Sequence, residues 1–266
     1  MHQIKIRYPK NITDKEIEKF FIKIGLKKLV LESKIKISES VDQRIMKTPQ
    51  PPDLRDLYRL YMFIILNKRT TVLEFGTGYS TLVMHCALLS NSNKFGLKKP
   101  FSRCKYPFTI FSLDNNRHFM KISEQRIKKY SKQIKLVKFF YSKANMTMYN
   151  GNFAVEYKNL PRVNPDFIYL DGPSQWAPGS DLNNVTTAHS DFMPMSCDIA
   201  KIENFLTPGT IIIADGRTAN SYFLKNCFKR KWKFVHDTRN DQCYFLLIDR
   251  PLGIYNLEQL NFYNKN

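Results

Sequence analysis

The stretch Leu73-Glu-Phe-Gly-Thr-Gly-Tyr-Ser-Thr81 decides the fold that we expect for this chain of 266 residues. The apolar run at 71–75 is typical of a short buried strand, and residues 80–89 have the pattern of a helix. Gly76 and Gly78 lie between them, where glycine permits a tight turn and a close approach of a ligand to the backbone. A dinucleotide-binding fingerprint would need a third glycine at position 81, which is threonine, so a bound pyrophosphate is not favoured.

Outward from this stretch, short apolar strands alternate with helices of about ten residues. We expect further strands at 109–113, 134–140, 167–170 and 210–214, helices at 118–130, 196–206 and 219–228, and two closing strands at 233–235 and 243–248 that pair as a hairpin. Residues 90–107 are polar, basic and broken by Gly and Pro, which predicts an inserted loop. The alternation predicts an α/β fold with a doubly wound, mostly parallel Rossmann-like sheet covered on both faces.

The first fifty residues differ in character from the rest. Apolar positions in 14–29 recur at helical spacing and predict an amphipathic helix. Three prolines at 49, 51 and 52 follow a polar stretch, and Asp53 is a suitable N-cap for a helix over 54–67. We therefore expect an N-terminal helical appendage at residues 1–52 and the main domain at residues 53–266.

The chain is strongly basic, with 42 Lys and Arg against 23 Asp and Glu and a formal net charge of +19. An anionic partner such as nucleic acid or an acidic glycan would explain this charge. A general codon bias toward lysine would also explain it, and we favour that explanation because the charge is spread along the chain. A hydrophobic fraction of 43% excludes a fully disordered chain.

The cysteines and the N-terminus predict a cytoplasmic protein. The five cysteines are odd in number and have no CxxC spacing, which argues against a zinc knuckle or a disulfide framework and suits a reducing compartment. The first twenty residues carry charge throughout and lack the apolar core of a signal peptide. The apolar run at 60–66 is far shorter than the ~20 residues of a membrane span.

Acidic residues end several of the predicted strands. Asp114 ends the second, Asp171 the fourth and Asp215 the fifth. In open α/β sheets, ligands bind outside the carboxyl ends of the strands, at the point where the strand order reverses. A carboxylate at the end of the second strand can accept two hydrogen bonds from a ribose diol. A glycine loop after the first strand and an acid after the second together predict a nucleoside site.

At these residues the chain resembles the class I S-adenosylmethionine-dependent methyltransferases, and most closely their small-molecule and glycan O-methyltransferase branch. The resemblance covers about residues 53–250 and rests on Glu74-Phe-Gly-Thr-Gly78, on Asp114 and on Phe167-Ile-Tyr-Leu-Asp-Gly172. It implies a site for S-adenosylmethionine in which the methionine portion lies near Glu74, Gly76, Thr77, Gly78, Ser80 and Thr81, the ribose near Asp114 and Asn115, the adenine near Ala144 and Asn145, and the reacting end near Asp171.

Methyl transfer to a hydroxyl would need a base beside the acceptor. Asp171 is the first candidate and His189 the second, because His189 lies in a long segment, 175–194, that could cover the strand ends. Asp215 and Lys201 are further candidates at the same edge.

A catechol-type branch of the family uses a divalent metal, and Asp171 with Asp215 could supply two of its ligands. Gly216 stands where that branch would have Asn or Asp, so a metal is not favoured. Arg217 could contact an acidic substrate or pair locally, and the sequence does not choose between these roles.

Several other functions are weighed against small-molecule O-methylation. The turn Asp171-Gly-Pro-Ser174 lacks the Pro-Pro-aromatic pattern of base-amine methyltransferases, and Cys197 follows serine and not the proline of pyrimidine C5 enzymes. A ribose or tRNA methyltransferase remains the alternative enzyme, and a non-catalytic nucleoside-binding protein the alternative outside enzymes. An oxidoreductase is weakened by Thr81, and hydrolase or kinase motifs are absent from the sequence. The preferred acceptor is an acidic sugar or polysaccharide precursor.

Overall fold

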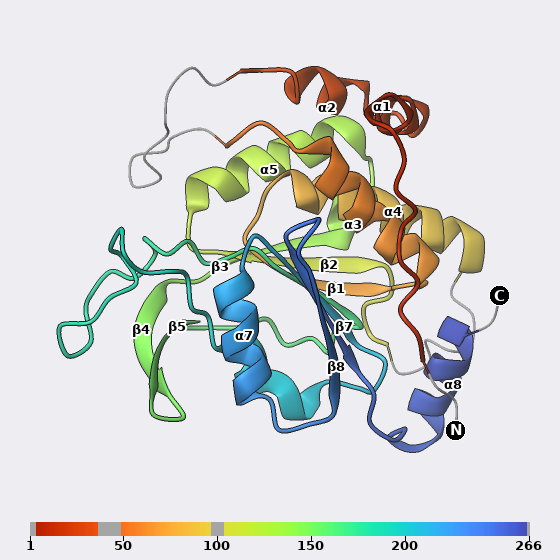
Figure 1. Ribbon diagram of the computed structural model, residues 1–266. Helices are drawn as coiled ribbons and strands as arrows, with labels where there is room; N and C mark the ends of the chain where they lie inside the picture. The colour runs from red at the N-terminus through yellow and green to blue at the C-terminus, as the bar shows by residue number, and fades with distance from the viewer. Residues whose placement is uncertain (1–3, 37–48, 97–103, 265–266) are drawn as a thin grey trace.

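The protein, described here from a computed structural model over residues 4–36, 49–96 and 104–264, is built on a twisted seven-stranded sheet (Figure 1). The strands are β1 (Thr71–Phe75), β2 (Thr109–Asp114), β3 (Val137–Tyr141), β6 (Phe167–Leu170), β7 (Ile211–Asp215), β8 (Trp232–Asp237) and β9 (Gln242–Leu247). Their order is β3-β2-β1-β6-β7-β9-β8, parallel from β3 to β7, with β9 antiparallel to both β7 and β8. The predicted doubly wound sheet with an antiparallel closing hairpin is confirmed.

Helices cover both faces of this sheet because the central strands are apolar on both sides. Helices α3 (Leu54–Leu66), α4 (Tyr79–Phe95) and α5 (Arg117–Tyr130) lie on one face, and α6 (Asp198–Ile202) and α7 (Thr218–Cys227) on the other (Figure 1). Alternation along β1 feeds the two cores: Val72 packs under the first group, while Leu73 and Phe75 pack under the second.

The N-terminal segment packs on the first face. The helix predicted over 14–29 is divided at Gly25, with φ +86°, into α1 (Asp14–Lys23) and α2 (Lys27–Glu32). Ile17 and Phe21 of α1 are buried in the same core as α3. The predicted cap of α3 is confirmed, since the Asp53 carboxylate accepts from the backbone amides of the first turn. The described part of this N-terminal segment thus contributes to the core of the main sheet, and the division into an appendage at residues 1–52 and a domain stays a prediction.

The structure adds elements that the sequence analysis does not contain. A hairpin of β4 (Ala144–Tyr149) and β5 (Asn152–Tyr157) takes the place of a crossover helix between β3 and β6, and α8 (Gly253–Asn264) packs near the amino ends of the parallel strands. Short 3₁₀ turns precede β3 (Ile134–Leu136) and follow α6 (Glu203–Phe205).

Helix α4 extends to Phe95, so residues 90–95 of the predicted loop are helical. The remainder of that loop lies partly outside the described residues. Within the described ranges, every helix is too short or too polar to cross a lipid bilayer.

Candidate functional site

The carboxyl ends of β1 and β6 meet where the strand order reverses, and two glycines let their loops touch. A Cβ atom on Gly172 would lie 2.5 Å from the backbone nitrogen of Gly76, and one on Gly76, where φ is +90°, would lie 3.0 Å from the carbonyl carbon of Asp171. Both contacts are to backbone, which cannot swing aside as a side chain can. Glycine at these two positions therefore permits the close approach of the loops.

A cavity of about 670 Å³ opens at this edge of the sheet. The strand ends supply its floor, and the hairpin and the segment after β6 supply its walls. Its lining includes Gly76, Thr77, Asp114, Asn115, Asn116, Phe119, Tyr157, Asp171, Gly172, Pro173, Ser174, Gln175, Trp176, Met193, Pro194, Asp215, Gly216 and Arg217. A volume of this size is typical of a cofactor or small-ligand site.

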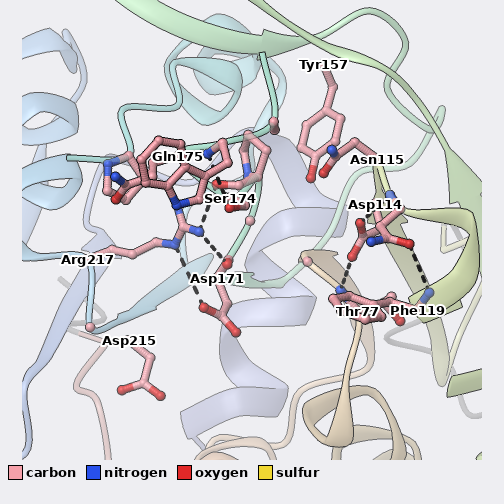
Figure 2. Close-up of a pocket in the computed structure, with 18 of the residues that line it drawn as sticks. Thr77, Asp114, Asn115, Phe119, Tyr157, Asp171, Ser174, Gln175, Asp215 and Arg217 are labelled. Carbon is pink, nitrogen blue, oxygen red and sulfur yellow. Dashed lines mark hydrogen bonds and ion pairs between the residues drawn. The ribbon is translucent and has the colours of Figure 1, made fainter. Parts of the chain in front are cut away.

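Asp114 joins the loops that follow β1 and β2. Its carboxylate accepts hydrogen bonds from the backbone amides of Thr77 (2.8 Å) and Asn116 (2.7 Å), and Figure 2 shows it at the cavity wall. Burial raises the pKa of Asp114, although these hydrogen bonds oppose the shift. The N-cap of α5 is Asn116 and not Asp114. The carboxylate is therefore not needed as a helix cap, and each oxygen keeps a lone pair for a ligand.

Asp171 and Arg217 lie together at the ends of β6 and β7 (Figure 2). The Asp171 side chain is 56% exposed, and its carboxylate lies 3.8 Å from Nε of Arg217. The guanidinium itself is buried and donates through Nη2 to the backbone carbonyls of Asp171 (2.5 Å) and Pro173 (2.9 Å). Although this side chain is more than half exposed, desolvation by the atoms packed around it raises the pKa of Asp171 to about 6, against the lowering effect of Arg217. This carboxylate can thus take up a proton near neutral pH.

Asp215 is the third acid at this edge. The Tyr169 hydroxyl donates to its carboxylate at 3.1 Å. Burial and the neighbouring Asp171 carboxylate raise the pKa of Asp215 to about 6. The lining thus carries three carboxylates and one guanidinium, which makes the pocket acidic within a chain of net charge +19.

Glu74, Ser80 and Thr81, which the family resemblance places around a bound methionine, lie beneath the glycine loop and outside the cavity lining. Glu74 is fully buried and accepts hydrogen bonds from the hydroxyls of Ser80 (2.6 Å), Thr81 (2.7 Å) and Ser112 (2.6 Å). Burial raises its pKa to about 7. Gly78, the N-cap residue of α4, is also absent from the lining. Glu74, Ser80 and Thr81 therefore support the glycine loop from beneath, and Gly76 and Thr77 are the part of the loop that lines the cavity.

Other expected site residues also lie away from the cavity. Ala144 and Asn145 belong to β4, and neither is among the lining residues. His189 is outside the lining as well: its ring is 54% exposed and accepts from the backbone amide of Asp191 at 3.2 Å. Lys201 pairs with Glu156 on the surface. The structure therefore brings Gly76, Thr77, Asp114, Asn115 and Asp171 together, and places His189 outside the cavity lining, so its role as the base stays a prediction.

Tyr157 is the main lining residue that sequence reasoning misses. Its ring projects from β5 into the cavity on the side of Asp114 and Asn115 (Figure 2). The hydroxyl is buried and has no hydrogen-bond partner among residues 4–36, 49–96 and 104–264. Burial and the Asp114 carboxylate raise its pKa well above the usual value, so the hydroxyl remains a donor at neutral pH.

The signal for the hairpin was present in the sequence as Asn150-Gly151. These residues have φ of +49° and +78°, as expected for a tight two-residue turn.

No family model and no curated protein sequence matches the chain. Among solved structures, an S-adenosylhomocysteine-bound methyltransferase from Podospora anserina aligns with 91% of this chain and 100% of its own, at 12% identity and a TM-score of 0.44. An O-methyltransferase from Streptomyces achromogenes involved in tomaymycin synthesis, solved with S-adenosylmethionine, aligns with 91% of this chain and 92% of its own, at 12% identity and a TM-score of 0.39.

An O-methyltransferase from Bacillus cereus, solved with S-adenosylhomocysteine, aligns with 90% of this chain and 92% of its own, at 13% identity and a TM-score of 0.38. Similarity at this level does not place any residue of the site.

Proposed function

We propose that this chain is an S-adenosylmethionine-dependent methyltransferase that methylates a hydroxyl of a small molecule or of a sugar or polysaccharide precursor. One observation supports the proposal most. The Gly76-Thr77 loop, Asp114 and Asp171 line a single cavity, and this cavity lies where the strand order of the sheet reverses. A glycine cradle with an adjacent carboxylate fits a nucleoside whose ribose hydroxyls need acceptors.

Each residue has a separate task in this proposal. Asp114 would accept the ribose hydroxyls, and the backbone of Gly76 and Thr77 would line the remainder of the nucleoside. Bound S-adenosylmethionine would supply an already activated methyl group. Asp171, with a pKa of about 6, would take the proton from the acceptor hydroxyl as the oxygen gains the methyl group. The carboxylate floor would also favour a cationic cofactor over a neutral one.

The charge of the cavity bears on the acceptor. Three carboxylates face it, and Arg217 is the one basic residue in its described lining. An acceptor without charge therefore fits better than the acidic sugar or polysaccharide precursor preferred from the family resemblance and the net charge together. The same acidity argues against RNA as the acceptor at this cavity, because a phosphate would meet carboxylates on entry. A non-catalytic nucleoside-binding protein remains the alternative to an enzyme.

Isothermal titration with S-adenosylmethionine, S-adenosylhomocysteine and NADH tests the cofactor assignment. We expect both sulfur nucleosides to bind, NADH to bind far more weakly, and Asp114→Ala to lose most of the affinity. Asp191→Ala, at an exposed carboxylate outside the lining, is the matched control. Equal affinity for S-adenosylhomocysteine in Asp114→Ala and the unchanged protein would overturn the proposal.

The enzyme assignment has a test of its own. The protein is incubated with methyl-labelled S-adenosylmethionine and a panel of neutral sugars, uronic acids, phenols and RNA. Transfer of label to a neutral hydroxyl compound supports the proposal. Binding of the cofactor with no transfer to any compound in the panel favours the non-catalytic alternative.

A further inference from the structure

The guanidinium of Arg217 places a positive charge beside Asp171. The Arg217 side chain is only 8% exposed, although it belongs to the loop that follows β7. It reaches across to the end of β6, where Nη2 holds the backbone carbonyls of Asp171 and Pro173 and Nε faces the Asp171 carboxylate (Figure 2). One guanidinium thus holds the main chain of the residue to which the proposed function assigns the proton transfer, and places a positive charge 3.8 Å from its carboxylate.

A divalent metal does not fit the same position. Magnesium and calcium need about six or more oxygen ligands, several of them from the protein or the substrate. The Asp171 carboxylate already faces a guanidinium, the Asp215 carboxylate accepts from Tyr169, and Gly216 has no side chain to offer. Across the described residues, no three His, Cys, Asp or Glu side chains are grouped so that they could hold a metal ion. A guanidinium also keeps its charge at every pH at which the protein is folded, and would repel a second cation.

We propose that Arg217 is the fixed cation of this site and serves, in place of a divalent metal ion, to hold Asp171 in position and to set the charge at the reacting end of the cavity. This inference rests on the proposed function. Arg217 is a positioning residue in this scheme because it acts through Asp171.

The remaining hydrogen-bonding capacity of Arg217 agrees with this role. Nη1 is buried and donates to no group of the described chain. A purely structural arginine in a loop would be expected to have its buried donors satisfied, because an unpaired buried donor costs about 1 to 3 kcal/mol. Here the side chain keeps an unpaired donor beside a cavity and lacks a close ion pair, since Nε and the carboxylate are 3.8 Å apart.

The first test asks directly whether a metal binds. Electron paramagnetic resonance measures free Mn²⁺ during titration of the full-length protein saturated with S-adenosylhomocysteine, and of Asp171→Asn under the same conditions. We expect no stoichiometric Mn²⁺ binding by either protein. One Mn²⁺ bound per unchanged protein, and lost in Asp171→Asn, would overturn the inference. This measurement needs no change at Arg217 and no known acceptor.

The second test measures the charge that Arg217 contributes. S-adenosylmethionine carries a sulfonium charge that S-adenosylhomocysteine lacks, so the ratio of their dissociation constants reports the charge near the sulfur. Arg217→Gln should shift that ratio by about threefold to tenfold toward S-adenosylmethionine, as expected for loss of a unit charge that lines the same cavity, at intermediate dielectric. Arg217→Lys should leave the ratio within about twofold of the unchanged protein, because the charge is kept.

A merely structural arginine would weaken both ligands equally and would not move this ratio. Circular dichroism and the thermal midpoint establish that each variant is folded, and Arg55→Ala on the exposed surface of α3 is the control for loss of a positive charge elsewhere. An unchanged ratio in folded Arg217→Gln would overturn the inference. Failure of the unchanged protein to bind either nucleoside would instead overturn the proposed function, while the Mn²⁺ titration, repeated without the nucleoside, would still report on the cation.

Discussion

Gly172→Ala should separate the two loops on which the cavity is built. The new Cβ would lie 2.5 Å from the backbone nitrogen of Gly76, 2.7 Å from the Cα of the same residue, and 2.8 Å from the carbonyl carbon of Phe75. Ordinary contacts begin near 3.4 Å, so the ends of β1 and β6 must move apart by almost an ångström. All three atoms are backbone at the carboxyl end of β1, a central strand of the parallel sheet, and no side-chain rotation relieves the contact.

The expected cost combines overpacking with a displaced site. Overpacking in a rigid interior costs about 1 to 3 kcal/mol, and we expect the upper part of that range here because two paired strands must move. Chemical denaturation should therefore show a loss of about 3 kcal/mol in the free energy of unfolding. A misplacement of about 1 Å at an active site can lower the rate of catalysis by about 100-fold. We expect the same displacement to lower the affinity for S-adenosylhomocysteine by at least about tenfold in isothermal titration.

Gly179→Ala is the matched control for this substitution. It lies in the same segment after β6, and a Cβ there would have nothing within 4 Å. We expect Gly179→Ala to keep both the stability and the affinity of the unchanged protein. If Gly172→Ala behaves as the control does, the two loops are not in the contact described, and the account of the cavity floor is wrong.

Three further substitutions separate the cavity from its supports. Asp114→Asn should weaken binding of S-adenosylhomocysteine by about 10- to 100-fold in isothermal titration, because a charge-assisted hydrogen bond is worth about 1.5 to 3 kcal/mol; a change of less than twofold would contradict the ribose assignment. Glu74→Gln should instead act on stability. The pKa of Glu74 is raised from 4.5 to about 7 on folding, so unfolding releases a proton between these values and stability falls as the pH rises through them. Denaturation at pH 5 and pH 8 measures the difference in the free energy of unfolding between Glu74→Gln and the unchanged protein. From pH 5 to pH 8 this difference should move in favour of Glu74→Gln by up to about 3 kcal/mol. The same pH dependence in both proteins would contradict this prediction. His189→Ala should leave the affinity and any methyl transfer unchanged, because the ring is exposed and outside the cavity lining; loss of transfer would restore it as a candidate base.

The parallel strands could be predicted from sequence because each is a short apolar run with an identifiable end. The residue after the run at 71–75 is glycine, and those at 109–113, 167–170 and 210–214 are followed directly by aspartate. Parallel pairing brings such ends to one edge whatever the lengths of the connections, which is why Asp114 and Asp171 could be expected near Gly76 although they are far apart in the chain. The strands begin and end within a few residues of the predicted limits, because the ends of an element depend on packing that the sequence pattern does not show.

What sequence could not supply was the direction of individual side chains. Glu74 and Thr77 stand three residues apart in one motif, yet Glu74 points beneath the loop to three hydroxyls while Thr77 lines the cavity. Alternation along a strand places Glu74 on the face opposite its neighbours, and the family resemblance alone could not distinguish a loop brace from a ligand contact.

The hairpin of β4 and β5 was not predicted from the sequence, and it forms one wall of the cavity. Between β3 and β6, where the sequence analysis predicts no element, the chain turns at Asn150-Gly151 and returns as β5. The edge of β5 is then fixed by hydrogen bonds from Val155 to Met195 and from Cys197 to Val155, which tie it to the segment before α6. A strand held in this way has little freedom to rotate, so the ring of Tyr157 is directed into the cavity by backbone pairing on both sides of β5. The same pairing joins the hairpin to the end of the segment that follows β6, so substitutions that loosen either element should alter the cavity from both walls together.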